Sequence, residues 1–428
     1  MARAPVREPE RGAALALLLA VFEERRMLSE AVEGGALAAL DVAGKARAQR
    51  LAATTLRHLD RADAVLARHL RKDPPMRVRL ILRLATVEML EVGAPAHGVV
   101  NAAVTLTQAA RRQAHLSGLV NAVLRKVASV PRVEWDAMTP RRLPRALRAR
   151  LVAVWGAAAV AAMETAHMAG APLDLTLRAG AGDWAARLGA ETLPTGSLRL
   201  RGAGAVSALP GYAEGAWWVQ DAAAALPARV LAPRPGERVL DLCAAPGGKT
   251  LQLAAAGAEV TALDISERRM ALVAQNLART GLAARRVVAD ALEWRDAGGF
   301  DAVLVDAPCT ASGTIRRHPE LPLLRGVEAL AELAPLQARM IDHALTLLRP
   351  GGRLVYCSCS LLPEEGEDQL ARALDVHPGL RADAAALAVE GVAPEWLGGG
   401  GLRLRPDFWA ARGGLDGFFI AAMRVAGG

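Results

Sequence analysis

The sequence predicts a multidomain chain in which an all-α bundle is followed by a small linking subdomain and an α/β domain. Three observations predict this fold class. The 428 residues exceed the roughly 100–200 residues of one domain, and 52% of them are hydrophobic, which is enough for more than one core. Apolar residues recur at helical spacing in the first part of the chain. Short apolar strands alternate with helices in the last part.

Residues 1–130 are expected to form the helical bundle. Turn-forming residues interrupt their helical pattern at residues 34–35, 73–75 and 93–95. Residues 131–215 contain several prolines between short helical and strand-like pieces, so we expect them to form the linking subdomain.

The apolar run at residues 13–22 is expected to be a buried first helix. It follows basic residues, as the apolar part of a signal peptide does, but Glu8 and Glu10 lie among them. Residues 23–26 carry four charges where a cleavage site would stand. No uninterrupted apolar run approaches the roughly 20 residues of a membrane span, so no membrane partner is expected.

The cysteine content favours a reducing compartment. Four cysteines in a chain of this length are too few for a disulfide framework, and no Cys/His spacing resembles a zinc site. We therefore expect a cytoplasmic protein without a metal, and we expect it to be a monomer.

Positive charge is concentrated in the first third of the chain. Residues 1–150 hold 26 basic and 14 acidic side chains, a net charge of +12, whereas residues 151–428 have a net charge of −4. This asymmetry is typical of a segment that meets a polyanion such as RNA. A solvated basic face or a protein-binding surface is the alternative.

The α/β domain is expected at residues 216–428, with a parallel sheet covered by helices on both faces. The expected strands are residues 238–242, 259–265, 286–289, 300–305 and 353–357, with helices at 250–256 and 267–280. Two further strand-like runs, 401–405 and 417–425, have no helix between them. They suggest an antiparallel hairpin at the sheet edge.

A candidate cofactor loop follows the first of these strands. Residues 239–250 read V-L-D-L-C-A-A-P-G-G-K-T, which is a strand, a turn of small residues and a helix start. Glycines let the backbone approach a ligand, and a helix start favours its polar groups. The pattern is neither G-x-G-x-x-G nor G-x-x-x-x-G-K-[ST], which disfavours dinucleotide and P-loop sites. Asp264 and Asp290, at the ends of the next two strands, complete a set that indicates a nucleoside-bearing cofactor.

Thiols follow the last two of the expected strands. The fourth strand ends with Asp306 and Cys309, and the fifth ends with Cys357 and Cys359. A thiolate that adds to C6 of cytosine allows C5 to attack a methyl group, and an acid such as Asp306 can balance the charge moved onto the base. A base must then remove the C5 proton. Because residues two apart in a strand share a face, spacing leaves both Cys357 and Cys359 open as the nucleophile.

These motifs resemble the RNA cytosine-5 methyltransferases of the NOL1/NOP2/Sun group, which share D-x-x-A-A-P-G-G-K-T, D-A-P-C-[ST]-x-[ST]-G and a C-S pair after the fifth strand. Residues 313–320 are similar to the bacterial small-subunit (16S) rRNA methyltransferase B (Sun/Fmu) branch. Residues 101–104 and 118–125 resemble the antitermination factor NusB. The resemblance implies a NusB-like RNA-binding domain at 1–130 and a Rossmann-like class I methyltransferase domain at 216–428.

The resemblance also implies S-adenosyl-L-methionine as the cofactor and small-subunit rRNA as the partner, in rRNA processing. It gives Cys359 the role of nucleophile, Cys309 a role in release of the 5-methylcytosine product and Asp306 a contact with the cytosine. The chain departs from the family where Cys357 stands in place of the usual Thr, and where Leu323 replaces a frequent aromatic residue. The expected cofactor site comprises Cys243, Ala244, Ala245, Pro246, Gly247, Gly248, Lys249, Asp264, Asp290 and Asp306.

Two other functions remain open at this stage. The same chemistry could act on tRNA, or the chain could be a non-catalytic RNA-binding, antitermination-like factor with a degenerate methyltransferase domain. The intact Asp306, Cys309 and Cys359 argue against degeneration. The sequence leaves open which cytosine is modified, and whether free rRNA or an assembling particle is the substrate.

Overall fold

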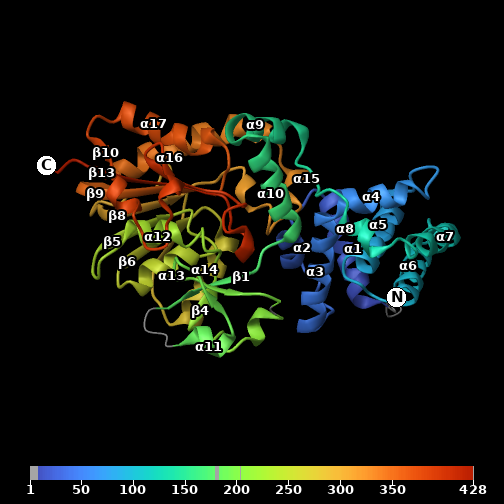
Figure 1. The fold of residues 1–428 in the computed structure, drawn as a ribbon. Helices are drawn as coiled ribbons and strands as arrows, with labels where there is room; N and C mark the ends of the chain where they lie inside the picture. Colours follow the sequence, from blue (N-terminus) through green and yellow to red (C-terminus); the bar gives the residue numbers. More distant parts are fainter. Residues whose placement is uncertain (1–7, 179–182, 203, 428) are drawn as a thin grey trace. The chain divides into compact units, whose positions relative to one another are not determined.

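The computed structural model describes residues 8–178, 183–202 and 204–427. The chain forms two compact units (Figure 1). Unit 1 consists of Met1–Gly170 and Ile315–Gly326, and unit 2 consists of Ala171–Thr314 and Val327–Gly428. The division at Gly170 falls inside the expected linking segment 131–215, so that segment contributes to both units.

Unit 1 is helical, as the apolar spacing predicts. Its main helices are α1 (Pro9–Phe22), α2 (Leu28–Glu33), α3 (Val42–Arg57), α4 (Leu59–Ala67), α5 (Met76–Leu90), α6 (Ala96–Gln108), α7 (Ser117–Val127), α8 (Arg132–Asp136), α9 (Arg145–Trp155) and α10 (Ala157–Ala169). Helix α5 is central, since most of its side chains are buried and it contacts α1, α3, α4, α6 and α7. Its buried Arg83 donates two hydrogen bonds to Asp63, at 2.7 and 2.6 Å, which compensates the buried charge. Helix α1 is buried along its apolar run, as expected.

None of the helices in the described ranges is long and apolar enough to cross a membrane.

A segment from the second half of the chain packs within unit 1. It contains α15 (Leu321–Leu324), whose Leu323 packs against the helical core. The buried carboxylate of Glu320 accepts the N–H of Leu28 at 3.2 Å, and the guanidinium of Arg57 donates to the carbonyl of Arg316 at 3.1 Å. Residues 315–320 of the family-like motif 313–320 therefore pack within the helical unit.

Unit 2 begins with a small antiparallel sheet in the strand order β2-β3-β1-β4. Its elements are β1 (Leu173–Leu177), α11 (Trp184–Leu188), β2 (Glu191–Thr192), β3 (Leu198–Leu200) and β4 (Trp217–Val219). The guanidinium of Arg199 donates two hydrogen bonds to the buried carboxylate of Asp174, at 2.7 and 2.6 Å. This pair joins β3 to β1 in addition to the backbone ladder.

The larger sheet of unit 2 has nine strands within the described ranges, in the order β11-β12-β13-β9-β8-β5-β6-β7, with β10 beside β13. Its parallel strands are β5 (Arg238–Leu242), β6 (Glu259–Asp264), β7 (Arg285–Val288), β8 (Phe300–Asp306) and β9 (Leu348–Ser358). Its antiparallel strands are β10 (Leu380–Ala382), β11 (Leu397–Gly398), β12 (Gly401–Leu404) and β13 (Phe418–Val425). The five expected parallel strands and the terminal antiparallel pair are confirmed.

Helices cover both faces of the parallel strands (Figure 1). Helices α12 (Leu226–Leu231) and α13 (Gly248–Ala255) lie on one face, and α16 (Leu330–Thr346) and α17 (Glu367–Val376) lie on the other. Helix α14 (Glu267–Thr280) contacts α13 and has the bounds that the sequence predicts. Along β9, Cys357 joins the core beneath α12, whereas Tyr356 joins the core beneath α16.

Candidate active site

The carboxyl ends of the parallel strands bring the sequence-predicted site residues to one edge of the sheet. Leu242, at the end of β5, lies beside Leu263 of β6 and Val305 of β8. Asp306, at the end of β8, pairs in register with Cys357 of β9. The turns that follow these strands therefore surround one region, which is where open α/β sheets bind their ligands.

The turn between β5 and α13 packs closely against its neighbours and leads into an uncapped helix start. The N–H of Ala244 donates to the carbonyl of Leu263 at 3.0 Å, which fixes the turn against β6. Gly247 has a φ of 103°, and a Cβ there would lie 3.3 Å from Val273. Helix α13 starts at Gly248 without a side-chain cap, so its first N–H groups are suited to a carboxylate or another anionic group.

Cys243 lies in this turn but is not suited to nucleophilic attack. Burial, together with the carboxylates of Asp306 and Asp264, raises the pKa of its thiol to about 12. The thiol is therefore protonated at neutral pH.

The two acids expected to bind a nucleoside lie at the ends of neighbouring strands. Asp264 ends β6, and its buried carboxylate accepts the N–H of Ala245 at 3.2 Å. Asp290 follows β7, is exposed, and accepts the N–H of Leu292 at 2.8 Å. The N–H of Ala289 donates to the carbonyl of Asp264 at 3.3 Å, which holds the two strand ends together.

Lys249 forms an ion pair that the sequence did not reveal. Its Nζ lies 2.7 Å from Oδ2 of Asp306 and 5.4 Å from the centre of the Phe418 ring. Burial favours the neutral amine, but the nearby Asp306 carboxylate outweighs it and raises the pKa of Lys249 above its ordinary value. The sequence motif places Lys249 only in the cofactor loop. The structure adds a charged contact between this loop and Asp306.

Asp241, within β5, is a fully buried carboxyl group. The hydroxyl of Thr250 donates to its Oδ2 at 2.6 Å, while Oδ1 has no hydrogen-bond partner among the described residues. Burial raises the pKa of Asp241 to about 7. Below pH 4 the carboxyl is protonated in both the folded and the unfolded chain. Between about pH 4 and 7 only the unfolded chain loses the proton, so this group makes folding less favourable as the pH rises.

We expect the substitution Asp241→Asn to remove this pH dependence. Asparagine has nearly the same shape, and its carbonyl can still accept the hydroxyl of Thr250. The free energy of unfolding of the variant at pH 8 should exceed that of the unchanged protein by about 2–4 kcal/mol, with little difference at pH 4. Urea unfolding at both pH values measures this. An equal change at the two pH values would show that the carboxyl group does not titrate as inferred.

Cys309 and Cys359 face each other, with 3.3 Å between their sulfur atoms. Cys309 is buried, whereas Cys359 lies one residue beyond the end of β9 and is partly exposed. The hydrogen bond with Cys359 and burial raise the pKa of Cys309 well above its ordinary value. Cys309 is therefore a protonated thiol held against the more accessible sulfur.

Cys357 has a different environment, although spacing could not separate it from Cys359. Its side chain is 0% exposed in the core beneath α12, and its thiol donates to Oδ1 of Asp306 at 3.4 Å. Burial raises the pKa of Cys357 well above its ordinary value. A buried, protonated thiol is inert. The accessible sulfur at this strand end is that of Cys359.

The loop after Cys309 packs closely against two other segments. The N–H of Gly313 donates to the carbonyl of Cys359 at 2.9 Å, and its carbonyl accepts the N–H of Gly417 at 2.8 Å. A Cβ at Gly313 would lie 2.1 Å from the carbonyl oxygen of Gly417. Only glycine fits this position.

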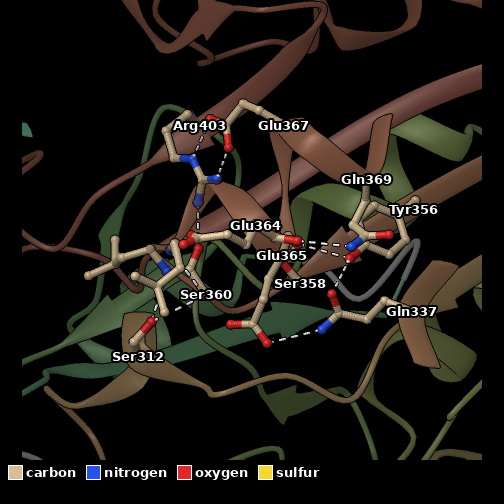
Figure 2. A network of polar contacts seen from close by, with 12 residues as sticks. Ser312, Gln337, Tyr356, Ser358, Ser360, Glu364, Glu365, Glu367, Gln369 and Arg403 are labelled. Carbon is tan, nitrogen blue, oxygen red and sulfur yellow. Dashed lines mark hydrogen bonds and ion pairs between the residues drawn. The ribbon is translucent and has the colours of Figure 1, made fainter. Parts of the chain in front are cut away.

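A buried polar network, part of which Figure 2 shows, links the segments that carry the two thiols. At its centre is Glu365, which binds Thr310 and Gln337. The sequence motifs did not indicate this residue. The available signal was a pair of adjacent carboxylates, Glu364 and Glu365, in the turn after a strand-end cysteine.

Two family descriptions match the chain. Residues 228–424 match the family described as 16S rRNA methyltransferase RsmB/F, and residues 8–129 match the NusB family. A ribosomal RNA small subunit methyltransferase B of Xanthomonas campestris pv. campestris is 36% identical, over 84% of this chain and 86% of that protein. The protein of the same description from Salmonella paratyphi B is 48% identical, over 42% of this chain and 44% of that protein.

Solved structures share the fold. The structure of PH0851 covers 99% of both chains with a TM-score of 0.75 at 24% identity. A methyltransferase homolog from Pyrococcus horikoshii covers 69% of this chain and 96% of its own, with a TM-score of 0.53 at 27% identity. The helical NusB-like part and the Rossmann-like methyltransferase part that the sequence predicts are thus both present.

Proposed function

Since the chain belongs to the RsmB/F family of 16S rRNA methyltransferases, we propose that it methylates carbon 5 of a cytosine in small-subunit rRNA through a covalent cysteine adduct. The observation that carries this proposal is the contact of Cys309 with Cys359, at 3.3 Å, beside the pair of Lys249 and Asp306. Two thiols and a charge pair at one sheet edge suit an attack on a pyrimidine ring.

The domain roles follow from the same premise. We assign RNA docking to residues 1–130 and catalysis to residues 216–428, with residues 131–215 as the link. The match of residues 8–129 to the NusB family supports the first assignment, and the match of residues 228–424 supports the second.

S-adenosylmethionine supplies an electrophilic methyl group when it is bound. The residues at the sheet edge fit this cofactor, because the uncapped start of α13 offers N–H groups to a carboxylate. Asp264 would hold the ribose hydroxyls and Asp290 the adenine side. The turn from Cys243 to Lys249, through Ala244, Ala245, Pro246, Gly247 and Gly248, would line the site, with Asp306 at its border.

Cys359 would act on the base as the nucleophile. Its thiolate forms a bond to C6, and the electron pair of the C5–C6 double bond becomes available for C5 to take the methyl group. Asp306 would contact the cytosine, and the ammonium of Lys249 that is paired with it would donate a hydrogen bond to the negative charge moved onto the ring.

Cys309 would assist the release of the product. Removal of the C5 proton by a base restores the C5–C6 double bond and expels the sulfur of Cys359. The protonated thiol of Cys309 lies 3.3 Å from that sulfur and can donate a hydrogen bond or a proton to it as the C6–S bond breaks. The reactive base must be unstacked to reach the thiol, so a single-stranded or flipped cytosine is expected.

The experiment that tests the function uses the purified full-length chain with methyl-labelled S-adenosylmethionine. Unmodified 16S rRNA, as free RNA and in small-subunit particles, is compared with unmodified tRNA, and the digested nucleosides are identified by mass spectrometry. We expect labelled 5-methylcytosine from the 16S rRNA samples. The label in tRNA alone would favour a tRNA enzyme, and binding without any methylation would favour a non-catalytic factor.

A basic cleft in unit 1 is a specific place for RNA to dock. It has a volume of about 470 Å³ and lies between the end of α4 and helix α7. Arg71, Lys72 and Lys126 line it together with apolar side chains, and all three are exposed. Each Lys or Arg that meets a phosphate releases bound counterions, which makes affinity depend on salt.

We expect the triple variant Arg71→Ala, Lys72→Ala, Lys126→Ala to bind rRNA fragments less tightly at low salt. The slope of log affinity against log salt should become shallower by about 2, since each contact to single-stranded RNA contributes roughly 0.7. Filter binding over a range of salt concentrations measures both quantities. Arg111→Ala with Arg112→Ala, at exposed positions outside the cleft, is the control. An unchanged slope in the triple variant would rule out the cleft as the docking site.

A further inference from the structure

Glu365 holds the two loops that carry Cys309 and Cys359. It ends a short turn after β9, and its side chain is 0% exposed. In the part of the chain that the structure describes, no Lys, Arg or His side chain forms an ion pair with it. A buried carboxylate without a cation is costly unless hydrogen bonds compensate it. The hydrogen bonds that compensate this buried carboxylate therefore identify the segments that it holds in place.

The carboxylate fixes the loop on the C-terminal side of Cys309. Its Oε1 accepts the N–H of Thr310 at 2.9 Å, and its Oε2 accepts the hydroxyl of Thr310 at 2.5 Å. Hydrogen bonds to an ionised acceptor are stronger than those between neutral groups. The residue that follows Cys309 is thus held by both its backbone and its side chain.

The N-terminal side of Cys309 is held through Gln337 of α16. The side-chain amide of Gln337 donates to Oε1 of Glu365 at 3.0 Å and to the carbonyl of Pro308 at 2.9 Å. Gln337 is itself fully buried. Cys309 is therefore bracketed by Pro308 and Thr310, and both are bound to Glu365 directly or through one amide.

The same residue is bound to the segment that carries Cys359. The backbone carbonyl of Glu365 accepts the hydroxyls of Tyr356, at 2.8 Å, and of Ser358, at 2.6 Å (Figure 2). In addition, the hydroxyl of Thr310 lies 3.2 Å from that of Ser360. One buried glutamate thus joins the residues around both thiols.

We propose that Glu365 is a positioning residue that sets the contact between the sulfur atoms of Cys309 and Cys359, and thereby the rate at which the covalent adduct breaks down. The effect on the rate of adduct breakdown rests on the proposed function. The effect on the contact between the two sulfur atoms does not depend on it. The negative charge behind Cys309 also favours the protonated thiol that release requires.

The first test measures the geometry without RNA or cofactor. Diamide, an azo oxidant, removes two electrons and two protons from neighbouring thiols as a disulfide forms between them. Mass spectrometry of the full-length chain after brief diamide treatment follows the Cys309–Cys359 disulfide. We expect Glu365→Gln, which keeps the shape but loses the charge and an acceptor, to slow its formation at least tenfold. Glu364→Gln removes the same charge from the adjacent residue and should leave the rate unchanged.

The second test measures adduct breakdown with 16S rRNA and S-adenosylmethionine. Glu365→Gln should form the covalent RNA adduct at the normal rate but release it about tenfold more slowly, so that the adduct accumulates on a denaturing gel. A merely structural defect would instead lower adduct formation and cofactor affinity together. Thr310→Val, which removes one of the two contacts, should give a smaller effect in the same direction and serves if Glu365→Gln does not fold.

The outcomes test the positioning role of Glu365 and the proposed function separately. Normal disulfide formation in both folded variants overturns the positioning role, whatever the methylation assay gives. Slow disulfide formation, in a protein whose unchanged form makes neither adduct nor 5-methylcytosine, supports the positioning role and overturns the proposed function. Slow disulfide formation with normal adduct breakdown overturns the link to release.

Discussion

The substitution Cys359→Ala is expected to abolish both the covalent RNA adduct and the methylated product. The sulfur of Cys359 is the accessible thiol at the end of β9, whereas Cys309 and Cys357 are buried. Loss of a nucleophile usually costs at least about 10³-fold in rate. Denaturing gels for the adduct and mass spectrometry for 5-methylcytosine measure the two losses.

Cys309→Ala is expected to fail in a different way. Attack by Cys359 remains possible, but the sulfur loses the neighbouring thiol, at 3.3 Å, to which we assign its release. Covalently bound RNA should therefore accumulate while turnover falls. If Cys309→Ala turns over normally and traps no RNA, the release role is wrong.

Cys357→Ala is the matched control for the choice of thiol. The side chain is buried in the core, so its loss should lower stability by about 1 kcal/mol through the missing sulfur. The adduct should still form, although the rate can fall because Cys357 contacts Asp306. A variant Cys359→Ala that makes 5-methylcytosine, beside a Cys357→Ala that does not, would reverse the assignment.

The second large effect is expected for Lys249→Met, which keeps the length of the side chain and removes its charge. The carboxylate of Asp306 then loses the ammonium at 2.7 Å, and the ring charge loses its hydrogen-bond donor. Removing one such donor typically costs about 10²- to 10³-fold. Single-turnover methylation at saturating cofactor should fall by about this factor, while the adduct forms correspondingly slowly.

Cofactor affinity decides between the two roles that Lys249 can have. If it acts on the base through Asp306, calorimetry should show affinity for S-adenosylmethionine within about threefold of the unchanged protein. If it acts only as part of the cofactor loop, affinity should weaken greatly and the rate at saturation should recover. Asp306→Asn, which removes the partner of the same pair, should match Lys249→Met in the first case and not in the second.

The strands and the positions of the motifs were determined by the sequence alone. Continuous apolar runs bounded by turn residues give β5, β6 and β8 nearly at their observed bounds, because such runs are stable only between two layers of helices. Parallel strands direct their carboxyl ends to one edge. The order of the motifs therefore predicts that Asp264, Asp290, Asp306 and the thiols meet there.

Only the tertiary structure decided which groups contact one another at that edge. Cys357 and Cys359 are two residues apart, so they would share one face of a strand. Because β9 ends at Ser358, the thiol of Cys357 lies in the core, whereas that of Cys359 lies in the following turn. The partner of Lys249 and the role of Glu365 depend on contacts across 57 and 55 residues. The sequence pattern of a single segment shows which residues share a face of a strand, at a period of two residues, or of a helix, at a period of 3.6 residues. Pairings between distant side chains are fixed by packing, which the periodicity of a single segment does not encode.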